Sequence, residues 1–175
     1  MSNVDDLLDN FDDDDVYYDP EMSTLVPEGS YPAKIIDLYS KIINTQRGNK
    51  GMLYKPKYRL DDNVRNYSGR EVQDSGVWKF FGTKDASGKR ITGGSNANYK
   101  LFLDKMHIPM EKIEMEEEQR TIIKLPSITK DLILNKSVVI SVHHEEWQGT
   151  HGRNITPVAT LVRMRTESVN GQNNT

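Results

Sequence analysis

The sequence predicts a mostly β fold with one main helix. Several segments are rich in β-branched and aromatic residues and alternate between apolar and polar, one segment has helical periodicity, and turn-forming residues separate them. The chain has 175 residues, which suits one domain with flanking tails. It contains no cysteine, so neither a disulfide nor a thiolate metal site is possible.

Two strands are expected at the start of the domain. Residues 30–43 (SYPAKIIDLYSKII) are rich in Tyr and Ile and alternate in part, and residues 52–60 (MLYKPKYRL) alternate clearly. Because successive side chains of a strand point to opposite sides of the sheet, the three basic residues of the second segment face away from Tyr54 and Tyr58. Pro56 inside this segment indicates an edge or a bulge.

A third strand and the helix follow. Residues 70–81 (REVQDSGVWKFF) predict a strand, with a bulge or a close backbone approach at Gly76. Residues 82–94 are expected to form a long loop. A helix is predicted over 95–107, because its apolar residues are spaced along one face, and Pro109 ends it.

The second half of the domain is expected to close the fold. An acidic stretch at 111–118 leads into a short apolar segment at 121–125, and residues 127–131 begin one more short helix. Two strands, 137–147 and 154–165, are joined by a hairpin. The resulting order, β-β-β-α-β-β, is that of an OB-like barrel of five or six strands, although a small open sandwich with one helix also fits.

The two ends of the chain differ in composition from the domain. Residues 1–27 are predicted to be a disordered acidic tail, since ten of the 26 acidic residues lie at or before Glu28 and no Lys or Arg does. Residues 167–175 are polar and are also expected to be disordered. The OB-like domain is therefore predicted to span 28–166.

Charge is distributed unevenly along the chain. The net charge is −3, yet all 23 basic residues and only 16 acidic ones follow Glu28. Between Lys34 and Lys105 there are 15 basic and 7 acidic residues. An acidic tail ahead of a positive half-domain indicates either a surface that binds polyanions or a tail that folds back on its own body.

No catalytic motif stands out. The sequence has no cysteine nucleophile, no G-x-S-x-G turn, no G-x-x-x-x-G-K-[ST] loop and no H-E-x-x-H. His143, His144, Glu145 and His151 come nearest to a metal site, but neighbouring strand residues face opposite ways, so a solvated hairpin end is expected. The run 114–118 is interpreted as solvated surface. We therefore expect no enzyme activity, no metal and no cofactor.

Basic residues interleaved with aromatic ones support the functional prediction. Single-stranded nucleic acid is bound by cations along its phosphates and by flat rings that stack on its bases, each stack contributing about 1–3 kcal/mol. Phe80 and Phe102 are expected in the core instead. The predicted nucleic-acid-binding residues are Arg47, Lys50, Tyr54, Lys55, Lys57, Tyr58, Arg59, Trp78, Lys79, Phe81, Lys84, Lys89 and Arg90. Lys57 and Tyr58 would share one groove only if the strand twists or bulges at Pro56.

Several segments resemble a family of small bacteriophage proteins. They are the run from Val26 to Tyr31, the loop 47–51 (RGNKG), Gly76-Val77-Trp78, the helical segment 99–103 and the closing strands from Asn135 to Gly149. The family is found near phage replication and recombination genes and is regarded as binding single-stranded DNA through an OB-like fold. The resemblance covers residues 26–165. It implies a single-stranded DNA-binding protein of the host cytoplasm, but such proteins usually carry their acidic tail at the C-terminus.

The acidic tail is expected either to compete with DNA or to recruit a replication or recombination protein. Its predicted partner-binding residues are Asp5, Asp6, Phe11, Asp12, Asp13, Asp14 and Asp15. One alternative is a virion or host-takeover interaction protein whose tail mimics a polyanion. Another is a metal-dependent nucleic-acid enzyme built on His143, Glu145 and His151. The N-terminus lacks a signal-peptide pattern and no apolar run is long enough to cross a bilayer, so no membrane partner is expected.

Overall fold

The structure is a computed structural model that describes residues 17, 24–44, 50–84, 86, 88, 90–91 and 93–166. The predictions for Asp5 to Asp15, for residues 167–175, and for Arg47 and Lys89 concern positions outside these ranges. The side chain of Lys84 is also outside the described part. The OB-like barrel can be followed through the rest of the domain.

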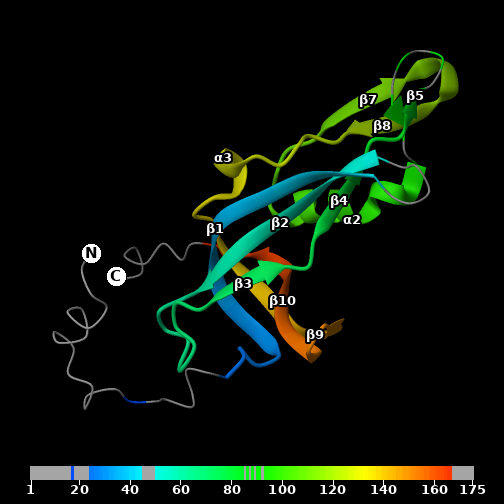
Figure 1. Cartoon of the computed structure of the whole chain (residues 1–175). Coiled ribbons are helices and arrows are strands. Elements are labelled where there is room, and N and C mark those ends of the chain that lie inside the picture. Colours follow the sequence, from blue (N-terminus) through cyan, green and yellow to red (C-terminus); the bar gives the residue numbers. More distant parts are fainter. Residues whose placement is uncertain are drawn as a thin grey trace, which may run out of the picture.

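Five strands close a barrel and a sixth extends it (Figure 1). Around the barrel β1 pairs with β2, β2 with β3, β3 with β10, β10 with β9, and β9 with β1, and only the β3–β10 pair is parallel. β4 pairs with β2 beyond the end of β3. The six strands are β1 (Gly29–Asn44), β2 (Lys50–Leu60), β3 (Glu71–Asp74), β4 (Val77–Phe80), β9 (Ser137–Gly149) and β10 (Gly152–Met164). The predicted mostly β, OB-like barrel is confirmed.

The predicted third strand is divided into β3 and β4 by Ser75 and Gly76. Gly76 has a φ of +119°, and a Cβ built on it would lie 2.8 Å from Cδ1 of Leu53. The atoms nearest to this position belong to side chains, and the prediction of one continuous strand over 70–81 is wrong. Pairing with β2 is interrupted here, because the Ser75 N–H donates its hydrogen bond to the Ala159 carbonyl of β10 at 2.9 Å. Pro56, which has no N–H, lies on β2 at this interruption.

One main helix packs against the barrel. The 3₁₀ turn Gly93–Asn96 leads into α2 (Ala97–Lys105), so the helix predicted over 95–107 is confirmed with slightly different ends. Asn96 fixes its start, because its amide accepts a hydrogen bond from the Phe80 N–H at 2.8 Å and donates one to the Phe80 carbonyl at 3.0 Å. The Asn96 amide thereby makes the two hydrogen bonds to the Phe80 backbone that a neighbouring strand would otherwise make.

A hairpin projects from the barrel where the sequence indicated only an acidic stretch and an apolar segment (Figure 1). It consists of β7 (Glu111–Met115) and β8 (Arg120–Lys124), joined by the 3₁₀ turn Glu116–Glu118. Glu and Lys are poor strand formers, so the density of charge hides the alternation of Ile113 and Met115. The expected loop 82–94 also contains a short pair, β5 (Thr83–Lys84) and β6 (Arg90–Ile91). The short helix is α3 (Lys130–Ile133).

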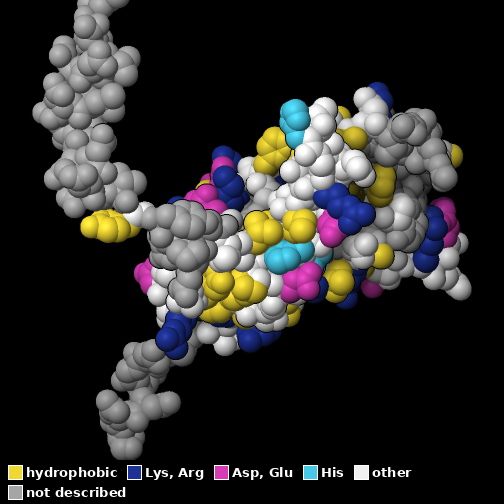
Figure 2. Space-filling model, turned by 60° about the horizontal axis from the view of Figure 1, so that its bottom comes forward, with side chains coloured by type: hydrophobic (Ala, Val, Ile, Leu, Met, Phe, Trp, Pro, Cys, Tyr) yellow, Lys and Arg dark blue, Asp and Glu magenta, His cyan; other side chains and the backbone are white. Residues whose placement is uncertain are grey.

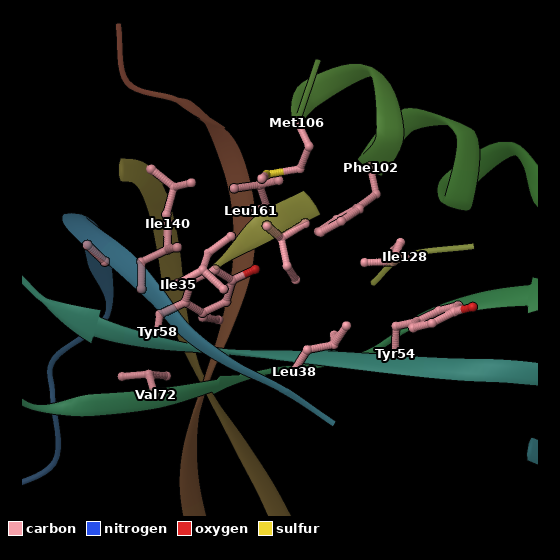
Figure 3. Packing of buried hydrophobic residues seen from close by; sticks show 14 of the residues in the cluster. Ile35, Leu38, Tyr54, Tyr58, Val72, Phe102, Met106, Ile128, Ile140 and Leu161 are labelled. Atoms are coloured by element: carbon pink, nitrogen blue, oxygen red, sulfur yellow. The ribbon is translucent and has the colours of Figure 1, made fainter. Parts of the chain in front are cut away.

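The core fills the barrel and continues under α2 (Figure 3). On β2 the alternation is strict: Tyr54, Tyr58 and Leu60 are buried, while the basic residues between them face outwards. The rings of Tyr54 and Tyr99 lie 5.8 Å apart, which joins the barrel interior to the helix. Val26, two residues ahead of the predicted domain boundary, is 1% exposed and belongs to this core.

Asp74 is a carboxylate buried at the end of β3. It accepts hydrogen bonds from the Tyr58 hydroxyl at 2.6 Å and from the Gly76 N–H at 2.8 Å. Burial raises the pKa of Asp74 from its usual value of 3.8, although both hydrogen bonds act in the opposite direction. Burial and the charge of Asp74 also raise the pKa of Tyr58 well above 10.0, so the hydroxyl stays a donor.

The raised pKa of Asp74 predicts the sign of a pH effect on stability. The contribution of the Asp74 carboxyl group to the free energy of unfolding is fully present below the unfolded-state pKa of 3.8. It is lost as pH rises through the folded-state pKa. The unfolding free energy of the wild type, compared with that of Asp74→Asn, should therefore fall as pH rises from about 3 to about 7 in urea titrations. Asp37→Asn is the control of opposite sign, because the Leu38 N–H and Lys130 lower the pKa of Asp37. If the unfolding free energy of the wild type minus that of Asp74→Asn stays constant or rises with pH, the sign predicted for Asp74 is wrong.

Candidate nucleic-acid interface

The outward side chains of β1, β2 and β3 form cross-strand rows on one surface. Lys34 lies opposite Arg59, and Tyr39 lies opposite Lys55. Residues directly opposite each other on adjacent strands share a face, so these side chains are neighbours. We call this surface the cationic face and define it by Lys34, Asp37, Tyr39, Lys41, Lys55, Lys57, Arg59, Glu71 and Gln73. Five of these nine residues are basic and two are acidic.

The acidic residues neutralise only part of this face. Glu71 pairs with Arg59 at 3.1 Å and with Lys57 at 3.9 Å, while Asp37 pairs with Lys130 of α3 at 3.1 Å. These pairs are half-exposed, and exposed ion pairs contribute only about 0–1 kcal/mol. A phosphate can therefore replace Glu71 as partner of both cations at little cost.

The aromatic residues predicted on β2 are not on the cationic face. Tyr54 is 2% exposed and Tyr58 is fully buried, so neither ring can stack on a base, and the prediction that they do is corrected. Pro56 faces the interior with them, so it does not bring Lys57 and Tyr58 to one side. The irregularity lies on β1 instead, between Ile35 and Asp37.

The bulge on β1 brings a different ring to the surface. Without it, the alternation that buries Ile35 would also bury Asp37 and Tyr39. With it, Leu38 points inwards and Tyr39, which is 51% exposed, points outwards beside Lys55. Tyr39 is a site residue that the sequence did not reveal, because a bulge leaves no clear signal in the pattern of residues.

β4 continues the same face with two aromatic side chains. Trp78 lies opposite Leu53 on β2, and a Cβ on Gly76 would meet the side chains of Leu53 and Lys55. Trp78 and Phe80 therefore lie on the same side of the sheet as Leu53 and Lys55. The rings of Trp78 and Phe80 stack with centroids 5.9 Å apart and planes at 17°. Both are half-buried. Trp78 was predicted as a platform, whereas Phe80 was assigned to the core.

The other predicted contacts are scattered. Lys79 points to the opposite side of β4, where its ammonium lies 5.7 Å from the Tyr99 ring and burial lowers its pKa. Its assignment to the interface is corrected, because neighbouring strand residues face opposite ways. Lys50 is exposed at the far end of β2 and Phe81 is half-buried beside it. Arg90 lies on β6, and its guanidinium donates to the Gly82 carbonyl at 3.3 Å.

Residues at the interruption between β3 and β4 line two separate hollows. The first, about 400 Å³, lies on the cationic face and is lined by Asp37, Tyr39, Lys55, Lys57 and Gln73. The second, about 550 Å³, lies between β4, α2 and β10. Their linings share no residue but adjoin along the chain, since Gln73 lines the first and Asp74 to Gly76 line the second.

The β9–β10 hairpin carries the histidines. His143 approaches Glu145 at 3.4 Å, while the His144 ring is 2.8 Å from the Val26 carbonyl, so the two histidines face opposite ways as predicted. Within the described ranges no group of three metal-binding side chains occurs. Seen from the lower end of the barrel, hydrophobic, basic, acidic and histidine side chains lie intermixed (Figure 2).

No protein-family model matches the chain, and no curated protein matches it. Among the helices that the structure describes, none has the length and apolar character needed to cross a membrane.

Proposed function

We propose that this protein binds single-stranded DNA through its cationic face and acts, without enzymatic activity, in DNA replication or recombination of a bacteriophage type. One observation carries the proposal: cross-strand pairing puts five cations, Tyr39 and Trp78 on the outer side of β1, β2 and β4. OB-type barrels bind oligonucleotides on the outer surface of their second and third strands, which correspond here to β2 and the pair β3 and β4.

The chemistry of this face suits a single strand. Lys55, Lys57 and Arg59 are spaced along one strand, where they can follow successive phosphates. Tyr39 and Trp78 offer rings to exposed bases, which a duplex would keep inside its stack. The acidic tail, whose predicted partner-binding residues lie outside the described ranges, would act on this face as competitor or would recruit a protein partner.

A titration with labelled oligonucleotides tests the proposal. We expect single strands to bind more tightly than duplexes of the same length. With three to five phosphate contacts, affinity should fall roughly 20- to 100-fold between about 50 and 200 mM salt. Fluorescence anisotropy at several salt concentrations measures both quantities. Absence of salt-sensitive binding would refute the proposal and favour a protein-interaction module that uses its acidic tail.

A further inference from the structure

We infer that the hollow between β4 and α2 is a base-binding pocket for the strand that runs over the cationic face. This inference rests on the proposed function and specifies where a base leaves that face. The pocket is lined by Asp74, Ser75, Gly76, Val77, Trp78, Phe80, Ser95, Asn98, Leu101, Phe102, Lys105, Thr160 and Leu161. Its volume of about 550 Å³ is within the range of small-molecule sites.

The walls of the pocket are apolar and flat. On one side lie the stacked rings of Trp78 and Phe80. On the other lies one face of α2, where Leu101 is 50% exposed although it is a large aliphatic side chain. A ring inserted between Trp78 and Leu101 would cover apolar surface that is now in contact with water, and such burial is favourable.

The rim of the pocket is polar. Asn98 and Thr160 are exposed at its edges, and both can donate and accept hydrogen bonds. Lys105 donates to the Leu161 carbonyl at 3.0 Å and keeps two further protons for an acceptor. Apolar walls with polar groups at the edge complement a heteroaromatic base, whose faces are apolar and whose edge is polar.

The pocket adjoins the cationic face at Gly76. Gly76 lines the pocket, and the aliphatic part of Lys55, which lines the other hollow, comes within 3.6 Å of the position that a Cβ on Gly76 would occupy. Cδ1 of Leu53 lies closer to that position, at 2.8 Å, so the Leu53 side chain fills the space above the glycine. A strand bound by Lys57 and Lys55 therefore passes beside the pocket, and the neighbouring cations favour a base of that strand over an apolar peptide as the occupant.

A change on the far wall tests the inference. Leu101→Glu puts a carboxylate at an exposed helix position and should weaken single-strand binding about tenfold, because a base can no longer bury its face there. Ile155→Glu is the matched control: it is 46% exposed, makes the same charge change on the β9–β10 hairpin, and should alter affinity less than twofold. With an abasic oligonucleotide of the same length, Leu101→Glu and the wild type should bind alike.

The ring wall gives a second, independent measurement. The chain has two tryptophans, so Trp147→Phe leaves Trp78 as the only indole. Its fluorescence should be quenched by an oligonucleotide with bases and not by an abasic one. Trp78→Ala should weaken binding roughly 5- to 100-fold, and Trp78→Phe should restore most of it.

The possible outcomes separate the pocket from the cationic face. Equal weakening by Leu101→Glu on normal and abasic strands would indicate charge repulsion and overturn the inference. Salt-sensitive binding that Leu101→Glu weakens no more than Ile155→Glu does would leave the proposed function standing without the pocket. If single strands do not bind at all, both fall. Quenching of Trp78 by an apolar peptide but not by oligonucleotides would assign the pocket to a protein.

Discussion

Replacing Lys55, Lys57 and Arg59 together by glutamine is expected to weaken single-strand binding about 100-fold at 0.1 M salt. The three side chains lie in a row on the outer side of β2, so their loss removes three phosphate contacts. For single strands each phosphate contact contributes about 0.7 to the slope of log affinity against log salt concentration. The magnitude of this slope should therefore fall by about 2 in the triple variant. Anisotropy titrations over a range of salt concentrations measure both changes.

The matched control for this triple change is on the β7–β8 hairpin. Lys112, Arg120 and Lys124 are also two lysines and one arginine, and their replacement by glutamine makes the same change in net charge. We expect less than about a threefold loss of affinity, because only long-range attraction is reduced. Equal losses for the two triple variants would show that net charge, and not the cationic face, determines binding.

Replacing Tyr99 by alanine is expected to reduce the free energy of unfolding by about 3–5 kcal/mol, a large part of the stability of a small domain. Tyr99 is fully buried, its ring lies 5.8 Å from that of Tyr54 with the planes tilted by 32°, and its hydroxyl donates to the Pro126 carbonyl. Burial raises the pKa of the hydroxyl, which therefore remains a neutral donor. Urea unfolding followed by far-ultraviolet circular dichroism measures the change.

Two further tyrosine variants serve as comparisons for Tyr99→Ala. Tyr99→Phe keeps the ring and loses only the hydrogen bond, so it should cost about 1–3 kcal/mol. Tyr39→Ala removes a ring that is 51% exposed and should cost less than about 1 kcal/mol, while it weakens single-strand binding. If Tyr39→Ala destabilised the fold as strongly as Tyr99→Ala, the assignment of the two rings to surface and core would be wrong.

Much of the fold followed from local patterns. Residues 30–43 and 52–60 correspond closely to β1 and β2, and the closing strands and α2 were also located correctly. Each of these segments carries its own periodicity, so neighbours in the chain suffice to identify it. The β7–β8 hairpin was missed because its residues are mainly charged. The split of 70–81 was missed because the interruption depends on Ala159, which lies far away in the sequence.

For the candidate site, the alternating pattern of residues 52–60 is enough to place Lys55, Lys57 and Arg59 on one side of a strand and Tyr54 and Tyr58 on the other. Alternation is a property of a single extended backbone, so no other part of the chain is needed to establish it. The rings that accompany the cations depend on how the strands pair in three dimensions. The bulge that exposes Tyr39 and the turn at Gly76 that carries Trp78 onto the same face both depend on pairing between strands. Such pairing joins residues far apart in the chain, and the local pattern does not encode it.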